Sequence, residues 1–151
     1  MWQRDGFAIS TDRAHLDRDV IWHFLHDEAY WSKGLPRDLF ERSIDTSLSF
    51  GLFEGTPGQG ATQIGFARVV TDGATFAWLC DVFVLEAYRG RGLATWLMAT
   101  VTAHPDLQVQ RSFVLATRDA HGLYAKFGWE PVEAGRFMRI ARPYRVDTGG
   151  T

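Results

Sequence analysis

The stretch from Asp81 to Ala94, DVFVLEAYRGRGLA, combines residue types that could bind a phosphate group. After Asp81, residues 82–85 are apolar and partly β-branched, which is typical of a buried strand. The loop that follows alternates cations with glycines: Arg89, Gly90, Arg91 and Gly92. Helix-forming residues begin at Leu93, and the unpaired N–H groups and dipole of a helix start favour negative charge. The stretch therefore predicts a phosphate or pyrophosphate site, although a tight turn with two solvated arginines would read the same way.

Two familiar phosphate loops do not match these residues. A P-loop ends in Gly-Lys-Ser/Thr, which the sequence lacks, and a dinucleotide-binding loop needs a third glycine where Thr95 stands. The remaining pattern is Arg-x-x-Gly-x-Ala, formed by Arg89, Gly92 and Ala94. It resembles the Gln/Arg-x-x-Gly-x-Gly/Ala pyrophosphate loop of the GNAT superfamily of acetyl-CoA-dependent N-acetyltransferases. A second stretch, LYAKFGW at residues 123–129, resembles the LYxKxGF segment of the same superfamily.

The resemblance implies acetyl-CoA as the co-substrate, with a defined set of contacts. The pyrophosphate would bind the glycine loop and the first helical turn, including Leu93 and Ala94. The backbone of the preceding strand would pair with the pantetheine arm through Phe83, Val84 and Leu85. An amide near Val84 would also stabilise negative charge that develops on the thioester oxygen. Thr117 stands where the family often has an Asn on the cofactor side.

Tyr124, in the second segment, is the candidate general acid. In many GNAT relatives the equivalent tyrosine contacts the cofactor and protonates the departing CoA thiolate. A phenol with a pKa of about 10 suits a thiolate leaving group. The alternative is that Tyr124 only packs its short helix against the sheet.

The sequence leaves open which group removes the proton from the amine. The stretch LCDVFV at residues 79–84 resembles the LEDxFV strand of polyamine-type GNAT enzymes, in which the Glu is a proposed base; here Cys80 replaces it. A thiol cannot replace a carboxylate as the base for an amine of high pKa. Asp81 is therefore the candidate base or ammonium anchor, or else a paired structural carboxylate. In a regular strand Asp81 faces away from Cys80, unless a bulge intervenes.

Aromatic side chains could line the acceptor pocket. The family builds this pocket from the loop between its first two helices and from the antiparallel strands. In this sequence those segments carry Tyr30, Trp31, Phe50 and Trp78, with Cys80 beside them. Such rings suit an aromatic or aliphatic amine or hold a cation on the ring face, although Phe50 and Trp78 could equally be core residues. His23 and His26 share a helical face without a third ligand at zinc-site spacing, so no metal is expected.

Composition limits the class of protein. A chain of 151 residues with 46% hydrophobic content predicts one domain spanning 1–151. A net charge of −2 gives no bulk attraction to nucleic acid or to an anionic membrane. The single cysteine, Cys80, excludes an internal disulfide and fits a reducing cytosol. No apolar run approaches the roughly 20 residues that cross a bilayer, so a cytoplasmic location is expected.

Hydrophobic periodicity predicts an α/β (α+β) fold with a mixed, mostly antiparallel sheet flanked by about four helices. Strands are predicted at 7–10, 48–54, 62–71, 75–85, 111–117 and 136–141. Helices are predicted at 16–25, 37–46, 120–127, and from Leu93 to a stop before Pro105. The order strand, helix, strand across residues 81–117 requires a parallel pair, and the apolar run at 111–117 predicts burial on both faces. This order is what the GNAT resemblance implies.

The leading interpretation is an N-acetyltransferase that acts on a small-molecule amine in a ternary complex with acetyl-CoA. The alternatives are acetylation of a protein Lys or N-terminus, and a non-catalytic acyl-CoA sensor. The resemblance also allows a homodimer, because GNAT domains often pair through their C-terminal strands.

Overall fold

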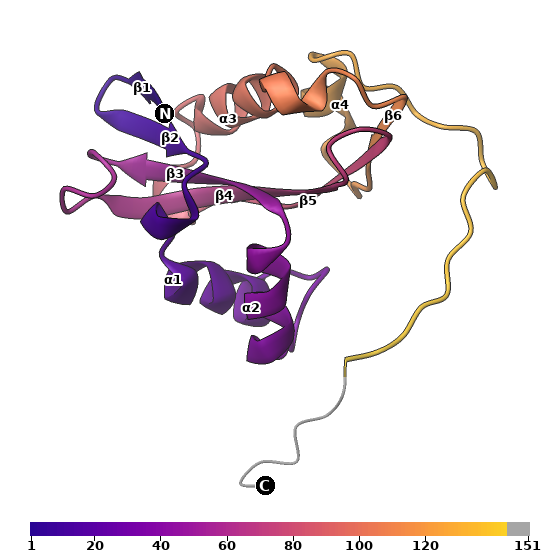
Figure 1. Ribbon diagram of the computed structural model, residues 1–151, viewed down its shortest axis with the longest axis horizontal. Helices are drawn as coiled ribbons and strands as arrows, with labels where there is room; N and C mark the ends of the chain where they lie inside the picture. Colours follow the sequence, from indigo (N-terminus) through magenta and orange to yellow (C-terminus); the bar gives the residue numbers. More distant parts are fainter. Residues whose placement is uncertain (145–151) are drawn as a thin grey trace, which may run out of the picture.

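The computed structural model describes residues 1–144, which form one six-stranded sheet in the order β1-β2-β3-β4-β5-β6 (Figure 1). The strands are β1 (Trp2–Arg4), β2 (Phe7–Ser10), β3 (Leu48–Glu54), β4 (Thr62–Thr71), β5 (Phe76–Val84) and β6 (Ser112–Leu115). The pairs from β1 to β5 are antiparallel, and β5 pairs with β6 in parallel. The predicted mixed sheet and its parallel crossover are confirmed.

Two pairs of helices cover the two faces of the sheet (Figure 1). On one face lie α1 (Arg18–His23), which continues into a π-helical turn (Phe24–Glu28), and α2 (Arg37–Asp45). On the other face lie α3 (Leu93–Thr102) and α4 (His121–Ala125). Short 3₁₀ turns occur at Arg13–His15, Glu86–Tyr88 and Pro105–Leu107. The predicted α/β class is therefore confirmed.

Each helical face closes its own hydrophobic core. The fully buried Leu97, Met98 and Val101 place one side of α3 on the sheet. On the opposite face, Phe40 and Ile44 of α2 are fully buried with Phe66 of β4. Burying one such side chain contributes roughly 1.5 to 3 kcal/mol, so the helices are held mainly by these contacts.

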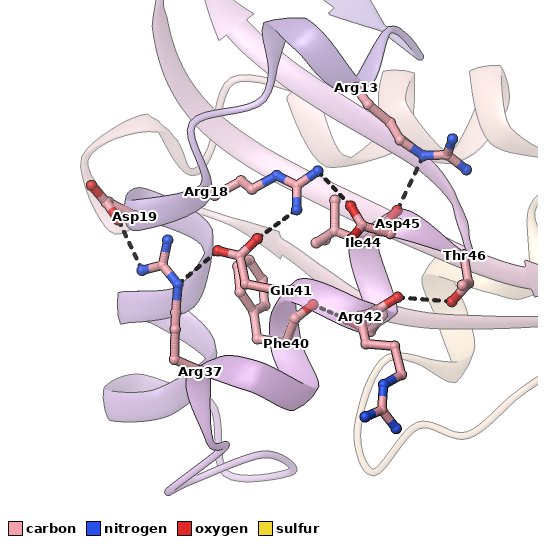
Figure 2. A network of polar contacts seen from close by, with 11 residues as sticks. Arg13, Arg18, Asp19, Arg37, Phe40, Glu41, Arg42, Ile44, Asp45 and Thr46 are labelled. Carbon is pink, nitrogen blue, oxygen red and sulfur yellow. Dashed lines mark hydrogen bonds and ion pairs between the residues drawn. The ribbon is translucent and has the colours of Figure 1, made fainter.

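A network of ion pairs fixes α1 against α2 (Figure 2). The Arg18 guanidinium donates to Glu41 at 2.5 Å and to Asp45 at 2.9 Å. The Arg37 guanidinium donates to Glu41 and to Asp19, both at 2.8 Å. Exposed ion pairs are worth little singly, but a shared carboxylate between two arginines sets the angle between the helices. The two helices carry the loop between them, which includes Tyr30 and Trp31.

Several sequence predictions are corrected by the structure. The strand predicted at 136–141 is absent, and every residue from 130 to 144 is exposed. The first helix begins at Arg18 rather than Leu16 and changes to π-helical geometry at Phe24. β6 is half-buried rather than buried, because it is the last strand in the sheet order and is covered on fewer sides. Finally, β1 was not predicted. It pairs with β2 through a turn in which Asp5 and Gly6 both have positive φ.

None of the helices in residues 1–144 has the length and apolar character that a membrane span requires.

Candidate active site

A β-bulge in β5 brings Cys80 and Asp81 to the same face of the sheet. Phe66 pairs with Phe83 and Arg68 pairs with Cys80, so two residues of β5 lie opposite Ala67 alone. Asp81 has a φ of 55°, in the left-handed region that favours glycine. The side-chain contacts of Asp81 are to Arg68 and Trp31, on the α1–α2 side of the sheet. The bulge therefore overrides the regular alternation that would send Asp81 to the other face.

Beyond this bulge, the edge of β5 that faces β6 is unpaired. The β5–β6 ladder ends at the pair Leu79 and Leu115, while β5 itself continues to Val84. The Leu85 N–H donates to the Ile64 carbonyl at 2.8 Å. Because hydrogen-bonded and non-hydrogen-bonded pairs alternate, Val84 turns its N–H and C=O away from β4. An extended chain with amide groups could pair with this edge.

A hydrogen bond from Arg89 shows that the Val84 carbonyl points away from β4. Its guanidinium Nε donates to the Val84 carbonyl at 2.9 Å, from the loop that follows the strand. The carbonyl is thus accessible on the side away from β4, and a ligand that pairs there would compete with Arg89. The basic loop therefore lies close enough to the strand edge for an arginine side chain of the loop to contact it.

The glycine loop ends at an uncapped helix start. Gly90 and Gly92 have φ values of 78° and 75°, and nothing lies within 4 Å of a Cβ built at either. Gly92 is the N-cap of α3 and supplies no side-chain hydrogen bond to the first turn. Arg91 is exposed beside the loop, with its guanidinium 5.3 Å from the Tyr88 ring centroid. Open backbone N–H groups, a helix dipole and two arginines are the groups that a diphosphate requires.

Tyr124 lies on α4, half-buried, close to the loop between α1 and α2. Burial raises the pKa of its phenol above the usual value, and Tyr30 and Asp119 raise it further. The phenol therefore keeps its proton at neutral pH, as a general acid must. Thr117, between β6 and α4, accepts a hydrogen bond from the Ala120 N–H at 3.0 Å, which leaves its hydroxyl proton free to donate.

Beyond the pair Leu79 and Leu115, β5 and β6 are no longer hydrogen-bonded to each other, and we call this gap in the ladder the split. The loop between α1 and α2 spans the split. On one side, the Trp31 indole Nε1 donates to Asp81 of β5 at 3.0 Å. On the other, the Arg118 guanidinium carbon lies 3.7 Å from the centroid of the Tyr30 ring. Because Arg118 follows β6, the loop contacts both walls of the split. The loop therefore connects β5 with the segment after β6 beside the free edge of β5.

Cys80 lies beside Asp81 as a neutral thiol. Burial, and then the Asp81 carboxylate, raises the pKa of Cys80 to about 12. Trp78, two residues earlier, is 37% exposed on the same face, where it pairs with Val70. The structure thus brings Trp31, Cys80 and Asp81 together, whereas Trp78 lies at the solvent-exposed edge of this group.

Two other sequence candidates lie elsewhere. Phe50 is fully buried on the α3 side of the sheet against Trp2 and His104, so it is a core residue. His23 and His26 both contact Asp27 at the exposed end of α1. Among residues 1–144 no group of three metal-binding side chains comes together.

Sequence reasoning missed Arg68 and Arg118. Arg68 stands in the apolar run TQIGFARVVT, where a lone arginine is normally assigned to the solvent face. The signal that could have revealed Arg68 is a charged residue in an otherwise buried strand, because such a residue needs an oppositely charged partner, here Asp81. Arg118 lies in a loop, and loop contacts leave no periodic signal.

Comparisons with known proteins show the family to which the chain belongs. Residues 58–131 match the family described as "Acetyltransferase (GNAT) domain". A Gibberella zeae protein named "Putative acetyltransferase" is 32% identical over 143 residues, covering 83% of this chain and 79% of that protein. A crystal structure of a GNAT-family protein from Xanthomonas campestris pv. campestris is 46% identical with a TM-score of 0.84, covering 93% of this chain and 96% of that one.

A third structure shares the fold at lower identity. It is AAC(6')-Iy in complex with a bisubstrate analogue, CoA-S-monomethyl-acetylneamine, with 23% identity and a TM-score of 0.60, covering 91% of this chain and 100% of that one. The chain described here belongs to the GNAT family and is an acyltransferase. Enzymes of this family use acetyl-CoA.

Proposed function

We propose that the protein transfers an acetyl group from acetyl-CoA to the amine of a small molecule, by direct attack of the amine in a ternary complex. One observation carries the proposal. At Val84, β5 has no strand partner on the side of β6, where its carbonyl accepts only from the Arg89 side chain, and the strand leads directly into the glycine loop and the uncapped start of α3. A pantetheine arm needs the first feature and a diphosphate needs the second, and here they are consecutive in the chain.

In this proposal, main-chain groups bind acetyl-CoA, which supplies an activated acetyl thioester. The N–H groups of Gly92, Leu93 and Ala94 hold the diphosphate, with Arg91 adjacent. The Val84 N–H and C=O pair with the pantetheine amides between Phe83 and Leu85, and Arg89 leaves the Val84 carbonyl to join the diphosphate. Thr117 adds its hydroxyl from the opposite wall.

Two side chains handle charge at the reacting centre. Tyr124 donates its proton to the departing thiolate, which its raised pKa supports. Both oxygens of Asp81 are already engaged, one by Arg68 and one by Trp31. With both oxygens already accepting hydrogen bonds, Asp81 in this proposal orients the acceptor site, and the amine loses its proton to water.

The acceptor pocket favours a compact amine with an apolar or aromatic body. Its walls are the rings of Tyr30 and Trp31, the neutral thiol of Cys80 and, at the margin, Trp78. The loop that carries the first two rings is attached to both sides of the split, which suits a small molecule better than an extended peptide. The AAC(6')-Iy complex, in which the bisubstrate analogue joins CoA to acetylneamine, supports a small-molecule amine as the acceptor, whereas the apolar or aromatic body is argued from the pocket walls alone.

Release of the CoA thiol, together with the mass of the acetylated product, tests the proposal. The panel consists of arylamines, aliphatic amines, polyamines, amino acids and Lys-containing peptides. We expect turnover with one class of small amine and none with peptides. Tight acetyl-CoA binding with no product from any amine would instead indicate a sensor, and acetylated peptide would indicate a protein acetyltransferase.

We also propose a cytoplasmic homodimer that forms through the C-terminal segment 130–144. This segment follows α4 and swings out along one side of the molecule without regular structure (Figure 1), and its last residue, Tyr144, lies near Arg68 and Asp81. It carries Phe137, Met138 and Ile140 at exposures of 55%, 96% and 77%. β6 ends the sheet order, so its outer edge is available for pairing with a second copy. The cytoplasmic location rests on the lone cysteine and the composition alone.

A further inference from the structure

Arg68 forms the least exposed ion pair among residues 1–144. Its side chain is 17% exposed and that of Asp81 is 10% exposed. A buried ion pair is costly to desolvate, and apolar residues of similar volume often stabilise a fold as well or better. The pair therefore needs an explanation other than the stability of the fold.

The contacts of Arg68 connect four segments of the chain. Its Nε donates to Asp81 at 2.8 Å, and its Nη1 donates at 3.0 Å to the hydroxyl of Ser47, which lies between α2 and β3. The second oxygen of Asp81 accepts from Trp31 in the α1–α2 loop. Tyr144 also lies near this pair. Burial, and then the charge on Asp81, raises the pKa of the Tyr144 phenol. Arg68 thus links the end of α2, β4, the β5 bulge and the loop over the split.

We infer that Arg68 is a positioning residue for the acceptor: through Asp81 it holds Trp31, and with it the α1–α2 loop, over the split between β5 and β6. This inference rests on the proposed acetyl transfer, because the site binds an acceptor amine only if the protein carries out that reaction. Arg68 does not itself touch the reacting atoms. It acts through two successive hydrogen bonds, to Asp81 and then to Trp31.

The backbone at Asp81 explains why the arginine is required. The φ of 55° at Asp81 lies in the left-handed region, which is unfavourable for a residue other than glycine, so this conformation persists only while its contacts hold it. Without Arg68, the buried carboxylate has no cation beside it and must turn toward solvent or toward other donors. Either change weakens its acceptance of the Trp31 indole N–H. Between the two strands, the loop then keeps its contact of Tyr30 with Arg118. Its contacts to the π-helical turn, such as the Ser32 hydroxyl donating to the Leu25 carbonyl, remain in place.

A double-mutant cycle tests the route through Trp31. Arg68→Met should raise the KM for the acceptor by about 10-fold and change the KM for acetyl-CoA by less than about 3-fold. Arg68→Lys, which keeps the charge, should recover part of the loss. In a Trp31→Phe background, Arg68→Met should add less than about 2-fold, because the last link is already missing. The matched control is Arg4→Met, which removes an exposed ion pair with Asp5.

Amide hydrogen exchange gives a second readout that needs no turnover. Residues 29–34 should exchange roughly 10-fold faster in Arg68→Met than in the wild type, and at the wild-type rate in Arg4→Met. Unchanged exchange in a folded Arg68→Met protein, or effects of Arg68→Met and Trp31→Phe that multiply, would overturn the inference. If Arg68→Met does not fold, Arg68→Lys and Trp31→Phe give the same comparison. A wild type without turnover would overturn the proposed function, and the exchange result would still decide the role of Arg68 in holding the loop.

Discussion

Tyr124 is the residue on which proton delivery depends in this account. Replacing it with phenylalanine removes the hydroxyl and keeps the ring that packs between Trp129 and the sheet. General acid catalysis contributes roughly 100-fold to 10,000-fold, so kcat should fall by at least about 100-fold. The affinity for acetyl-CoA should be nearly unchanged, because its main contacts are to the backbone. Steady-state kinetics and calorimetric titration measure the two quantities.

The pH profile separates this role from simple packing. Because the pKa of Tyr124 is raised, the phenol loses its proton only above the usual value of about 10. The wild-type kcat/KM should therefore show no loss from Tyr124 ionisation below about pH 10. A Tyr124→Phe enzyme with full activity would move proton delivery to water or to another group.

Cys80 should be an unreactive thiol despite its place beside the site. With a pKa of about 12, its thiolate is scarce at pH 8. Since the thiolate is the nucleophile, a disulfide reagent should react roughly 1,000-fold more slowly with the native protein than with the unfolded chain. The single cysteine makes the rate directly measurable by absorbance. Rapid reaction in the native state would show that the thiol is accessible and that this face is more open than described.

At the scale of elements, the turn into α3 requires glycine at Gly92. An alanine there must adopt a φ near 75°, which costs about 1 to 2 kcal/mol. It also places a methyl group where the diphosphate would approach. Gly73, in the β4–β5 turn, has a φ of 76° and equally open surroundings, so Gly73→Ala has the same backbone cost far from the loop.

The two variants should therefore differ in binding and agree in stability. Urea unfolding should show a similar loss for Gly92→Ala and Gly73→Ala. Calorimetry should show weaker acetyl-CoA binding only for Gly92→Ala. Equal acetyl-CoA affinity in both variants would show that the first turn of α3 does not approach the cofactor.

Elements with local signals could be predicted from the sequence, and those set by distant contacts could not. Strands β3 and β4 have the predicted bounds because alternation and turn residues determine them locally. The glycine loop and the parallel crossover were likewise predicted. The bulge at Asp81 depends on the register between β4 and β5, and the ion pair with Arg68 depends on the bulge. Neither the bulge nor the ion pair produces a pattern in the sequence of one strand alone.

At the scale of the whole molecule, the C-terminal segment is the main difference from expectation. Residues 136–141, RFMRIA, have the pattern of a strand but find no partner within the described chain. A strand needs a neighbouring edge, and β6 offers one that a second copy could fill. The absence of a strand within one chain and the proposal of a dimer are thus physically connected.

Charges in the segment should therefore change the oligomeric state. A Met138→Asp and Ile140→Asp variant should be monomeric in light scattering, while the wild type is dimeric. Val109, at 67% exposure in the loop before β6, gives the control Val109→Asp, which should remain dimeric. A monomeric wild type at the concentrations used in activity assays would contradict the proposed dimer and leave the site on β5 intact.

The proposed function depends on the free edge of β5 and the start of α3 holding acetyl-CoA together. Backbone amide NMR of the 17.1 kDa protein, titrated with CoA, tests it most directly. Large shifts and slowed exchange are expected at Val84 and at residues 92–95, with small changes in β1 to β3. Saturable binding that leaves the Val84 amide unmoved, or that shifts a different face of the sheet, would contradict it.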